Sequence, residues 1–202
     1  MGFVYIFQSG TEHKFKIGLT RGETGARKKQ LSTGNPNPLI DFDVIETEHC
    51  EACEQFLHKT LQSKKISGGH AQEFFAVEPG ELQRVIQQAR DYICEYARVH
   101  PEAERLKQTR SNGELKKPGN EEISIYREIV ELREHEDRAR LRRELLECRL
   151  KIAIGDAAGI EGIATWKSGD RESFDQTAFK TAYPELYNSF KRSAQIRRWS
   201  LE

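Results

Sequence analysis

The chain has 202 residues, a mass of 23.3 kDa and a formal net charge of zero, with 37% hydrophobic and 32% charged residues. This length suits one ordinary domain with a second small element, and the mean hydropathy of -0.73 is typical of a soluble, rather helical chain. No apolar run reaches the ~20 residues of a membrane helix, and no signal-peptide pattern opens the chain, so a cytoplasmic location without membrane contact is predicted. Zero net charge excludes binding of nucleic acid through bulk charge, so any nucleic-acid site must be a local patch.

The predicted elements begin with two short apolar runs. Residues 3–8 (FVYIFQ) and 14–19 (KFKIGL) are rich in aromatic and β-branched side chains and flank a turn-like SGTEH, which predicts a β-hairpin. A short helix is expected next, and residues 38–48 (PLIDFDVIETE) predict a third strand. Apolar side chains at helical spacing predict helices over residues 48–63 and 80–99. The expected fold class is therefore α+β, with a three-stranded antiparallel sheet flanked by helices.

The composition changes after this first domain, which is expected to span residues 1–99. Residues 100–120 are polar, contain Pro and Gly and lose periodicity, which predicts a linker. Residues 121–154 predict a long, densely charged helix, and residues 155–202 predict a small α+β accessory element. The helix needs a partner surface, and its mixed charges favour pairing with a second copy or another protein over tracking along phosphates.

Four polar residues lie at the edges of the apolar elements of the first domain: Tyr5, Lys16, Arg27 and Glu54. A hairpin places Tyr5 and Lys16 side by side, and two helices can bring Arg27 and Glu54 toward them. A phenol, an ammonium, a guanidinium and a carboxylate together suit phosphodiester hydrolysis. Taken singly, each residue is more typical of a core tyrosine or an ordinary surface charge. Only their joint pattern favours a catalytic interpretation.

In this order, the residues resemble the GIY-YIG nuclease family, in its phage-type branch with a Lys-Ile-Gly second motif. The resemblance covers about residues 2–78 and depends on the agreement of five segments rather than on either short motif. Phe3 stands where Gly is usual in the family, and Lys16 replaces the second tyrosine, as is normal for this branch. The matching stretches are Phe3-Val4-Tyr5, Lys16-Ile17-Gly18, Arg27 in ARKKQLSTGNPNPL, Glu54 in EQFLH, and Glu73-Phe74-Phe75.

The resemblance implies a DNA endonuclease in which Tyr5 is the general base, Arg27 stabilises charge on the phosphate and Glu54 holds one Mg²⁺ or Mn²⁺. A free phenol has a pKa of ~10, so a cation is needed to lower that pKa, and Lys16 on the paired strand is expected to supply it. His58, one helical turn after Glu54, is a further catalytic candidate that could contact a phosphate or a metal-bound water. The alternative for His58 is a role in covering the helix face.

Basic residues near this set are expected to hold the DNA backbone on either side of the cut, through contacts that are sensitive to salt and independent of sequence. Two alternatives to a DNA endonuclease stay open. One is a DNA- or protein-binding module that keeps the nuclease fold without turnover, and the other is an RNA-directed nuclease. The basic residues are Lys14, Arg21, Lys28, Lys29, Lys64 and Lys65.

The tail, about residues 150–202, resembles the C-terminal piece of YqaJ-type phage recombination exonucleases. This resemblance implies a phage or prophage origin and an association with DNA processing, without a second active site. Lys191, Arg192 and Arg197 are expected to contact DNA or a protein partner, and the tail aromatics are expected to form a small core. The matching stretches are ATWK (164–167), Phe174-Asp175, Tyr183-Pro184-Glu185 and Arg197-Arg198-Trp199.

Cys50 and Cys53 form a Cys-x-x-Cys pair, which raises zinc binding with His49, His58 or His70 as a weak alternative. A structural zinc site needs four ligands, and no second Cys-x-x-Cys pair is present. Free thiols are therefore expected, with Cys53 packed against the sheet and Cys50 nearer to solvent.

Overall fold

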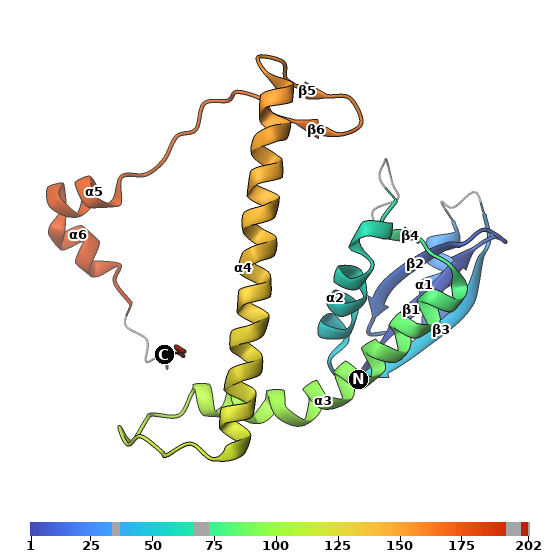
Figure 1. Ribbon diagram of the computed structural model, residues 1–202, viewed down its shortest axis with the longest axis horizontal. Coiled ribbons are helices and arrows are strands. Elements are labelled where there is room, and N and C mark those ends of the chain that lie inside the picture. Colours follow the sequence, from blue (N-terminus) through green and yellow to red (C-terminus); the bar gives the residue numbers. More distant parts are fainter. Residues whose placement is uncertain (34–36, 67–72, 193–198, 202) are drawn as a thin grey trace. The chain divides into compact units, whose positions relative to one another are not determined.

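The computed structural model describes residues 1–33, 37–66, 73–192 and 199–201, which divide near Thr109 into two compact units. The first unit contains a sheet with helices, and the second contains a long helix followed by short elements (Figure 1). The α+β class predicted from the sequence is confirmed. In the described parts of the chain, no helix combines the length and the apolar character needed to cross a membrane.

The sheet of the first unit has the strand order β3-β1-β2-β4, with antiparallel pairing throughout. β1 (Gly2–Ser9) and β2 (Lys14–Thr20) form the expected hairpin, and β3 (Leu39–Thr47) pairs with the other side of β1. The sequence predicted three strands. A short fourth strand, β4 (Phe74–Ala76), is added because its residues pair with the first half of β2 and Phe75 is fully buried.

Successive side chains of a strand point to opposite faces of the sheet, and each face carries its own core. The larger core lies between the sheet and two helices, α2 (Cys50–Thr60) and α3 (Pro79–Lys107), and a 3-10 turn, η1 (Gln62–Lys64), follows α2. In the smaller core, Tyr5, Phe7 and Leu39 pack with Leu31 of α1 (Thr24–Ser32) and with Phe74. The larger core includes Val4, Ile6, Phe15, Ile17, Ile45, Cys53, Leu57, Phe75, Leu82, Ile86 and Ala89.

α3 is longer than the sequence predicted. Its first half buries the expected apolar stripe, but the helix continues past residue 99 and through Pro101 to Lys107. The rings of Tyr96 and His100 stack with 4.3 Å between their centroids, a contact that supports the helix where proline removes a backbone hydrogen bond. The linker predicted over residues 100–120 is therefore confined to the segment after α3.

The second unit begins with α4 (Asn120–Ile154), which closely matches the long charged helix that the sequence predicted. A small two-stranded hairpin follows. Two short helices come next, and the second begins at Pro184. These elements are β5 (Gly159–Ile160), β6 (Ala164–Thr165), α5 (Gln176–Ala182) and α6 (Pro184–Ser189).

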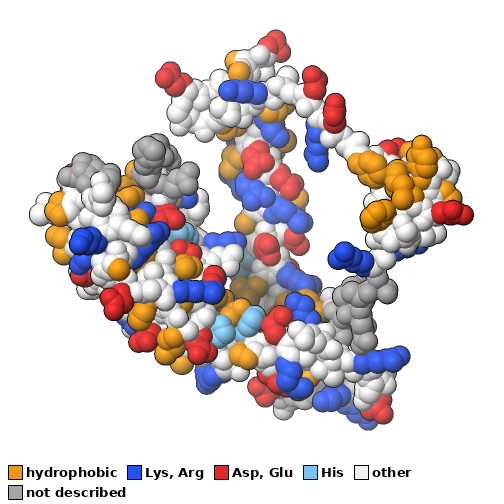
Figure 2. All heavy atoms as spheres, turned by 180° about the vertical axis from the view of Figure 1, so that it is seen from behind, with side chains coloured by type: hydrophobic (Ala, Val, Ile, Leu, Met, Phe, Trp, Pro, Cys, Tyr) orange, Lys and Arg blue, Asp and Glu red, His pale blue; other side chains and the backbone are white. Residues whose placement is uncertain are grey.

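The tail aromatics do not form the predicted core. Trp166 is 51% exposed and Trp199 is 68% exposed, because the short elements of the tail bury little surface. Phe179 contacts Phe174 and Tyr183, with ring centroids 5.0 and 5.5 Å apart. Figure 2 shows hydrophobic side chains gathered over α5 and α6.

Candidate active site

Tyr5 lies in the middle of β1, directly opposite Gly18 of β2. Its side chain is buried and its ring stacks on Phe7, with 4.5 Å between the ring centroids. A Cβ atom at position 18 would lie 2.7 Å from Cζ of Tyr5, so only glycine leaves room for the tyrosine ring across β2. The glycine of the Lys-Ile-Gly segment thus allows the Tyr5 hydroxyl to lie over the neighbouring strand.

Arg27 of α1 interacts with the Tyr5 hydroxyl. Its guanidinium donates a hydrogen bond to Tyr5, and Nη1 donates another to Oε1 of Gln30 at 3.2 Å. Burial raises the pKa of Tyr5, Arg27 lowers it, and the charges of Glu73 and Glu54 raise it further. The pKa lies above its ordinary value as a result, so Tyr5 is a neutral phenol at neutral pH.

α2 brings Glu54 and His58 to the half of the outer β2 edge that β4 does not cover. The two residues lie four positions apart and so share one side of the helix. The backbone N–H of Leu19 donates to Glu54, and Nε2 of His58 lies 3.1 Å from the carbonyl oxygen of Ile17. A carbonyl only accepts, so Nε2 of His58 carries the proton and donates.

Glu54 is held in an environment that opposes its ionisation. Burial raises the pKa of the Glu54 carboxyl, His58 lowers it and Glu73 raises it, so the pKa lies above its ordinary value. A cation near this carboxylate would reverse the shift.

Lys16 forms an ion pair with Glu73 at the start of β4. Its side chain is 10% exposed, Nζ lies 2.9 Å from Oε2 of Glu73, and Nζ also lies 5.0 Å from the ring centroid of Phe74. A lysine buried to this extent requires a partner of opposite charge. The sequence led us to expect that Lys16 lowers the pKa of Tyr5, but Arg27 is the cation that does so.

The five catalytic candidates named from the sequence therefore come together, with Glu73 as an addition. We call this cluster the edge site. The charges of Arg27, Glu54 and Glu73 act on Tyr5, and those of His58 and Glu73 act on Glu54. The sequence analysis gave Glu73 no catalytic role, because the pairing of β4 with β2 that places it beside Lys16 was not predicted. The edge site consists of Tyr5, Lys16, Arg27, Glu54, His58 and Glu73.

The donor set of the edge site fits one hard divalent cation. Glu54 and Glu73 supply carboxylate oxygens, the ligands that Mg²⁺ and Mn²⁺ prefer. Within the described residues, no group of three or more His, Cys, Asp or Glu side chains could enclose a metal ion. An ion held at Glu54 would keep several waters, which is the usual mode for Mg²⁺.

Most of the basic residues expected to hold DNA are occupied by acidic neighbours. Arg21 contacts Glu51 at 2.7 Å, Lys64 contacts Glu81 at 3.3 Å, and Lys14 and Lys28 form ion pairs with Glu12 and Asp41. The side chains of Lys29 and Lys65 are exposed, without ion pairs to described residues. A phosphate backbone would have to compete with these carboxylates.

The basic residues of the tail are only partly described. Lys191 is exposed, with Nζ 5.3 Å from the ring centroid of Tyr187, and Arg192 is exposed as well. Arg197 lies outside the described residues. Contacts of these three side chains with DNA or protein stay a prediction.

Both cysteines of the Cys-x-x-Cys pair are buried thiols. Cys50 is buried rather than nearer to solvent, and its Sγ donates to the carbonyl oxygen of Thr47 at 3.0 Å. Burial raises the pKa of Cys53 to about 11, which disfavours the thiolate form that zinc needs. His70 lies outside the described residues. The structure gives no support to a zinc site at this pair.

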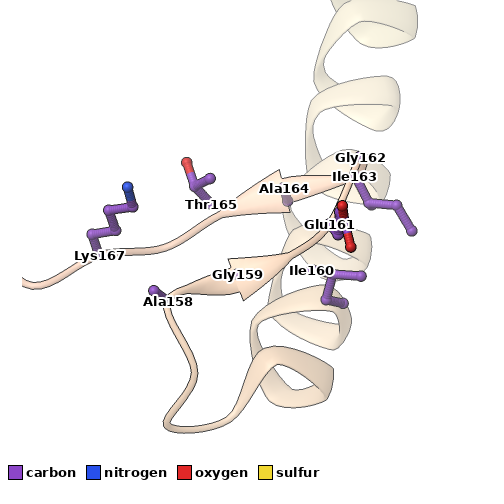
Figure 3. Close-up of a pocket in the computed structure, with 9 residues that line it drawn as sticks. All are labelled: Ala158, Gly159, Ile160, Glu161, Gly162, Ile163, Ala164, Thr165 and Lys167. Carbon is purple, nitrogen blue, oxygen red and sulfur yellow. The ribbon is translucent and has the colours of Figure 1, made fainter.

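A separate hollow of about 560 Å³ lies in the second unit, at the β5–β6 hairpin. Its walls are residues 158–165 and Lys167, which come from one short segment (Figure 3). It includes none of the residues of the edge site. Among the residues that line it, only Glu161 and Lys167 carry titratable side chains.

Residues 2–90 match the T5orf172 domain, which occurs in phage proteins and in proteins associated with GIY-YIG-like endonucleases. The matched segment contains the whole sheet and every residue of the edge site. The match links the first unit to nuclease-related or DNA-binding functions. No curated protein and no solved structure matches the chain significantly. The resemblance of the tail to YqaJ-type exonucleases stays a prediction.

Proposed function

We propose that the first unit is a metal-dependent DNA endonuclease that hydrolyses phosphodiester bonds at the edge site. The observation that carries this proposal is the convergence of Tyr5, Arg27 and Glu54 from a strand and two helices. The match of residues 2–90 to the T5orf172 domain supports it.

Each residue has a defined task in this reaction. Tyr5, as its phenolate, accepts the proton of the attacking water, and Arg27, whose guanidinium offers a planar pair of donors, binds the phosphate oxygens as charge develops. Glu54 holds the metal ion. Lys16 balances the charge of Glu73, and His58 bonds to the backbone of β2 on the same side of α2 as Glu54. The bound ion would act as a Lewis acid that stabilises charge on the phosphate and on the departing 3′ oxygen.

Cleavage of a DNA substrate with Mg²⁺ or Mn²⁺ tests the proposal. Tyr5→Phe, Arg27→Ala and Glu54→Ala should each reduce the cleavage rate at least about 100-fold, and a chelator should abolish cleavage by the native chain. Glu51→Ala, on the exposed side of the same helix, is the matched control and should retain activity. Persistence of cleavage in the Glu54 variant would contradict the assignment.

A binding module without turnover is the second candidate. The raised pKa of Tyr5 and the ion pairs of four basic residues favour it, because both weaken general-base catalysis and phosphate binding. Binding of DNA or protein by the native chain, with no cleavage at any metal concentration, would support this candidate. An RNA substrate in the same assay distinguishes the RNA-directed alternative.

A further inference from the structure

α4 is a long helix that is almost wholly exposed in the described structure. Ile154 is its one buried side chain, although apolar residues occur along its whole length. Leu132 is 60% exposed and Leu146 is 46% exposed. Helices in proteins gain most of their stability from packing an apolar face against a partner, so these exposed side chains indicate a missing partner.

Eight residues of α4 form a seam with the spacing of a coiled coil. Alternating steps of four and three residues join them, which keeps all eight on one side of a supercoiled helix. Six are apolar, and the other two, near the middle, are a glutamate and an arginine. The α4 seam consists of Ile125, Ile129, Leu132, Glu136, Ala139, Arg143, Leu146 and Leu150.

The two charged members of the α4 seam select the direction of pairing. In a parallel pair, Glu136 would face its own copy and Arg143 would do the same, which places like charges together. In an antiparallel pair, a two-fold axis between residues 137 and 138 places Ile125 opposite Leu150 and Ile129 opposite Leu146. Glu136 then lies one layer away from Arg143 of the second copy, where the two charges attract.

The remaining charges of α4 favour the same direction. Residues 120–137 contain seven acidic and two basic side chains, a net charge of -5, whereas residues 138–154 contain six basic and two acidic, a net charge of +4. Figure 2 shows both kinds of charge along the column of α4. The helix dipole accounts for such asymmetry only in the first and last turns, yet here it reaches the middle of the helix.

We propose that α4 is a dimerisation element, through which two copies of this chain pair antiparallel along the α4 seam. Antiparallel pairing covers the apolar members at both ends and places each acidic half against a basic half. Intrahelical ion pairs such as Arg138–Glu134, at 3.0 Å, hold the middle of the helix in shape. The proposal does not depend on the edge site or on its activity.

Oligomeric state in solution tests the proposal on the full chain. Sedimentation equilibrium at about 10 to 100 μM should show a dimer for the native chain. The variant with Ile125→Glu and Leu146→Glu, at exposures of 50% and 46% and each facing an apolar residue of the second copy, should be monomeric. The control carries Leu141→Glu and Leu145→Glu, on the opposite side of α4 at similar exposures of 61% and 56%, and should stay dimeric. A monomeric native chain would overturn the proposal, as would equal behaviour of the two variants.

A charge exchange tests the direction of pairing. Glu136→Arg alone and Arg143→Glu alone should each raise the dissociation constant at least about tenfold, because each places like charges in adjacent layers. The chain with both substitutions should recover the native constant. Circular dichroism checks that all three variants keep the native helix content. A double variant as weak as the single ones would overturn the antiparallel arrangement.

Discussion

Glu54 shows how a single side chain serves a site at a cost to folding. Its carboxyl is partly buried beside Glu73, and its pKa lies above the ordinary value. Ionisation of Glu54 therefore opposes folding at neutral pH. Groups whose pKa is shifted by their surroundings in this way are concentrated at functional sites.

Replacing Glu54 by Gln should raise the melting temperature at pH 7 by about 3 °C, because the variant has no charge to bury. The folded-state pKa is the higher one, so the cost is present above that pKa and disappears below the unfolded-state pKa of ~4.3. The difference between variant and native chain should thus shrink as the pH falls, which scanning calorimetry over a pH series measures. Glu51→Gln, whose carboxyl has a lowered pKa beside Arg21, should not raise the melting temperature.

The Lys16–Glu73 ion pair leads to a prediction about the pH dependence of cleavage. Glu73 raises the pKa of Tyr5, so Glu73→Gln should shift the rising limb of the pH–rate profile to lower pH. Lys16→Met leaves the Glu73 charge unbalanced and should shift that limb to higher pH. The profile of kcat/KM measures both, and a shift of the same sign in the two variants would remove the ion pair from the mechanism.

At the scale of elements, the hairpin of β1 and β2 places the site through its register. Tyr5 pairs with Gly18, so a Tyr–Gly contact across two strands decides where the hydroxyl lies. A shift by one residue would move Tyr5 to the other face of the sheet. The position of the polar residue Tyr5 within an otherwise apolar strand is therefore required for the site.

Gly18→Ala should destabilise the fold by about 1–3 kcal/mol and abolish cleavage, because a Cβ atom there would meet the Tyr5 ring. Gly25→Ala is the matched control. Apart from its chain neighbours and the helix backbone, no atom lies within 4 Å of a Cβ at position 25, in the first turn of α1, so this change should stabilise by about 0.5 kcal/mol. Denaturant unfolding measures both, and similar effects at the two positions would contradict the contact.

The elements differ in how far the sequence predicted them. The hairpin, α2 and the first half of α3 were predicted because their apolar periodicity is strong. β4 is three residues long and was missed as a strand, and Pro101 suggested a helix end that does not occur. Lys16 and Glu73 are 57 residues apart, so local spacing could not show that they pair. The exposed tail aromatics resemble core residues in composition alone.

At the scale of the whole molecule, charge balance limits how DNA can be held. The net charge is zero, and four of the six basic residues around the edge site form ion pairs. Exposed cations without ion pairs should therefore contribute more to the salt dependence of DNA binding than cations that already form ion pairs.

Lys29→Gln and Lys65→Gln should each reduce the slope of log affinity against log salt by about 0.9. Arg21→Gln should reduce it less, because Arg21 already bonds to Glu51. Fluorescence anisotropy of a DNA duplex with the native chain and the variants, over about 50 to 300 mM salt, measures the slopes. Equal slopes for all four proteins would exclude these lysines from the interface.

The half of the β2 edge that β4 does not pair with has a consequence for solubility. An open strand edge is a template on which other chains add strands and aggregate. Here Glu54 bonds to the backbone N–H of Leu19, and His58 bonds to the carbonyl of Ile17, so the groups proposed for catalysis also block that edge. Substituting both with alanine would expose a pairing edge, and loss of activity in such a chain would then be accompanied by self-association through the sheet.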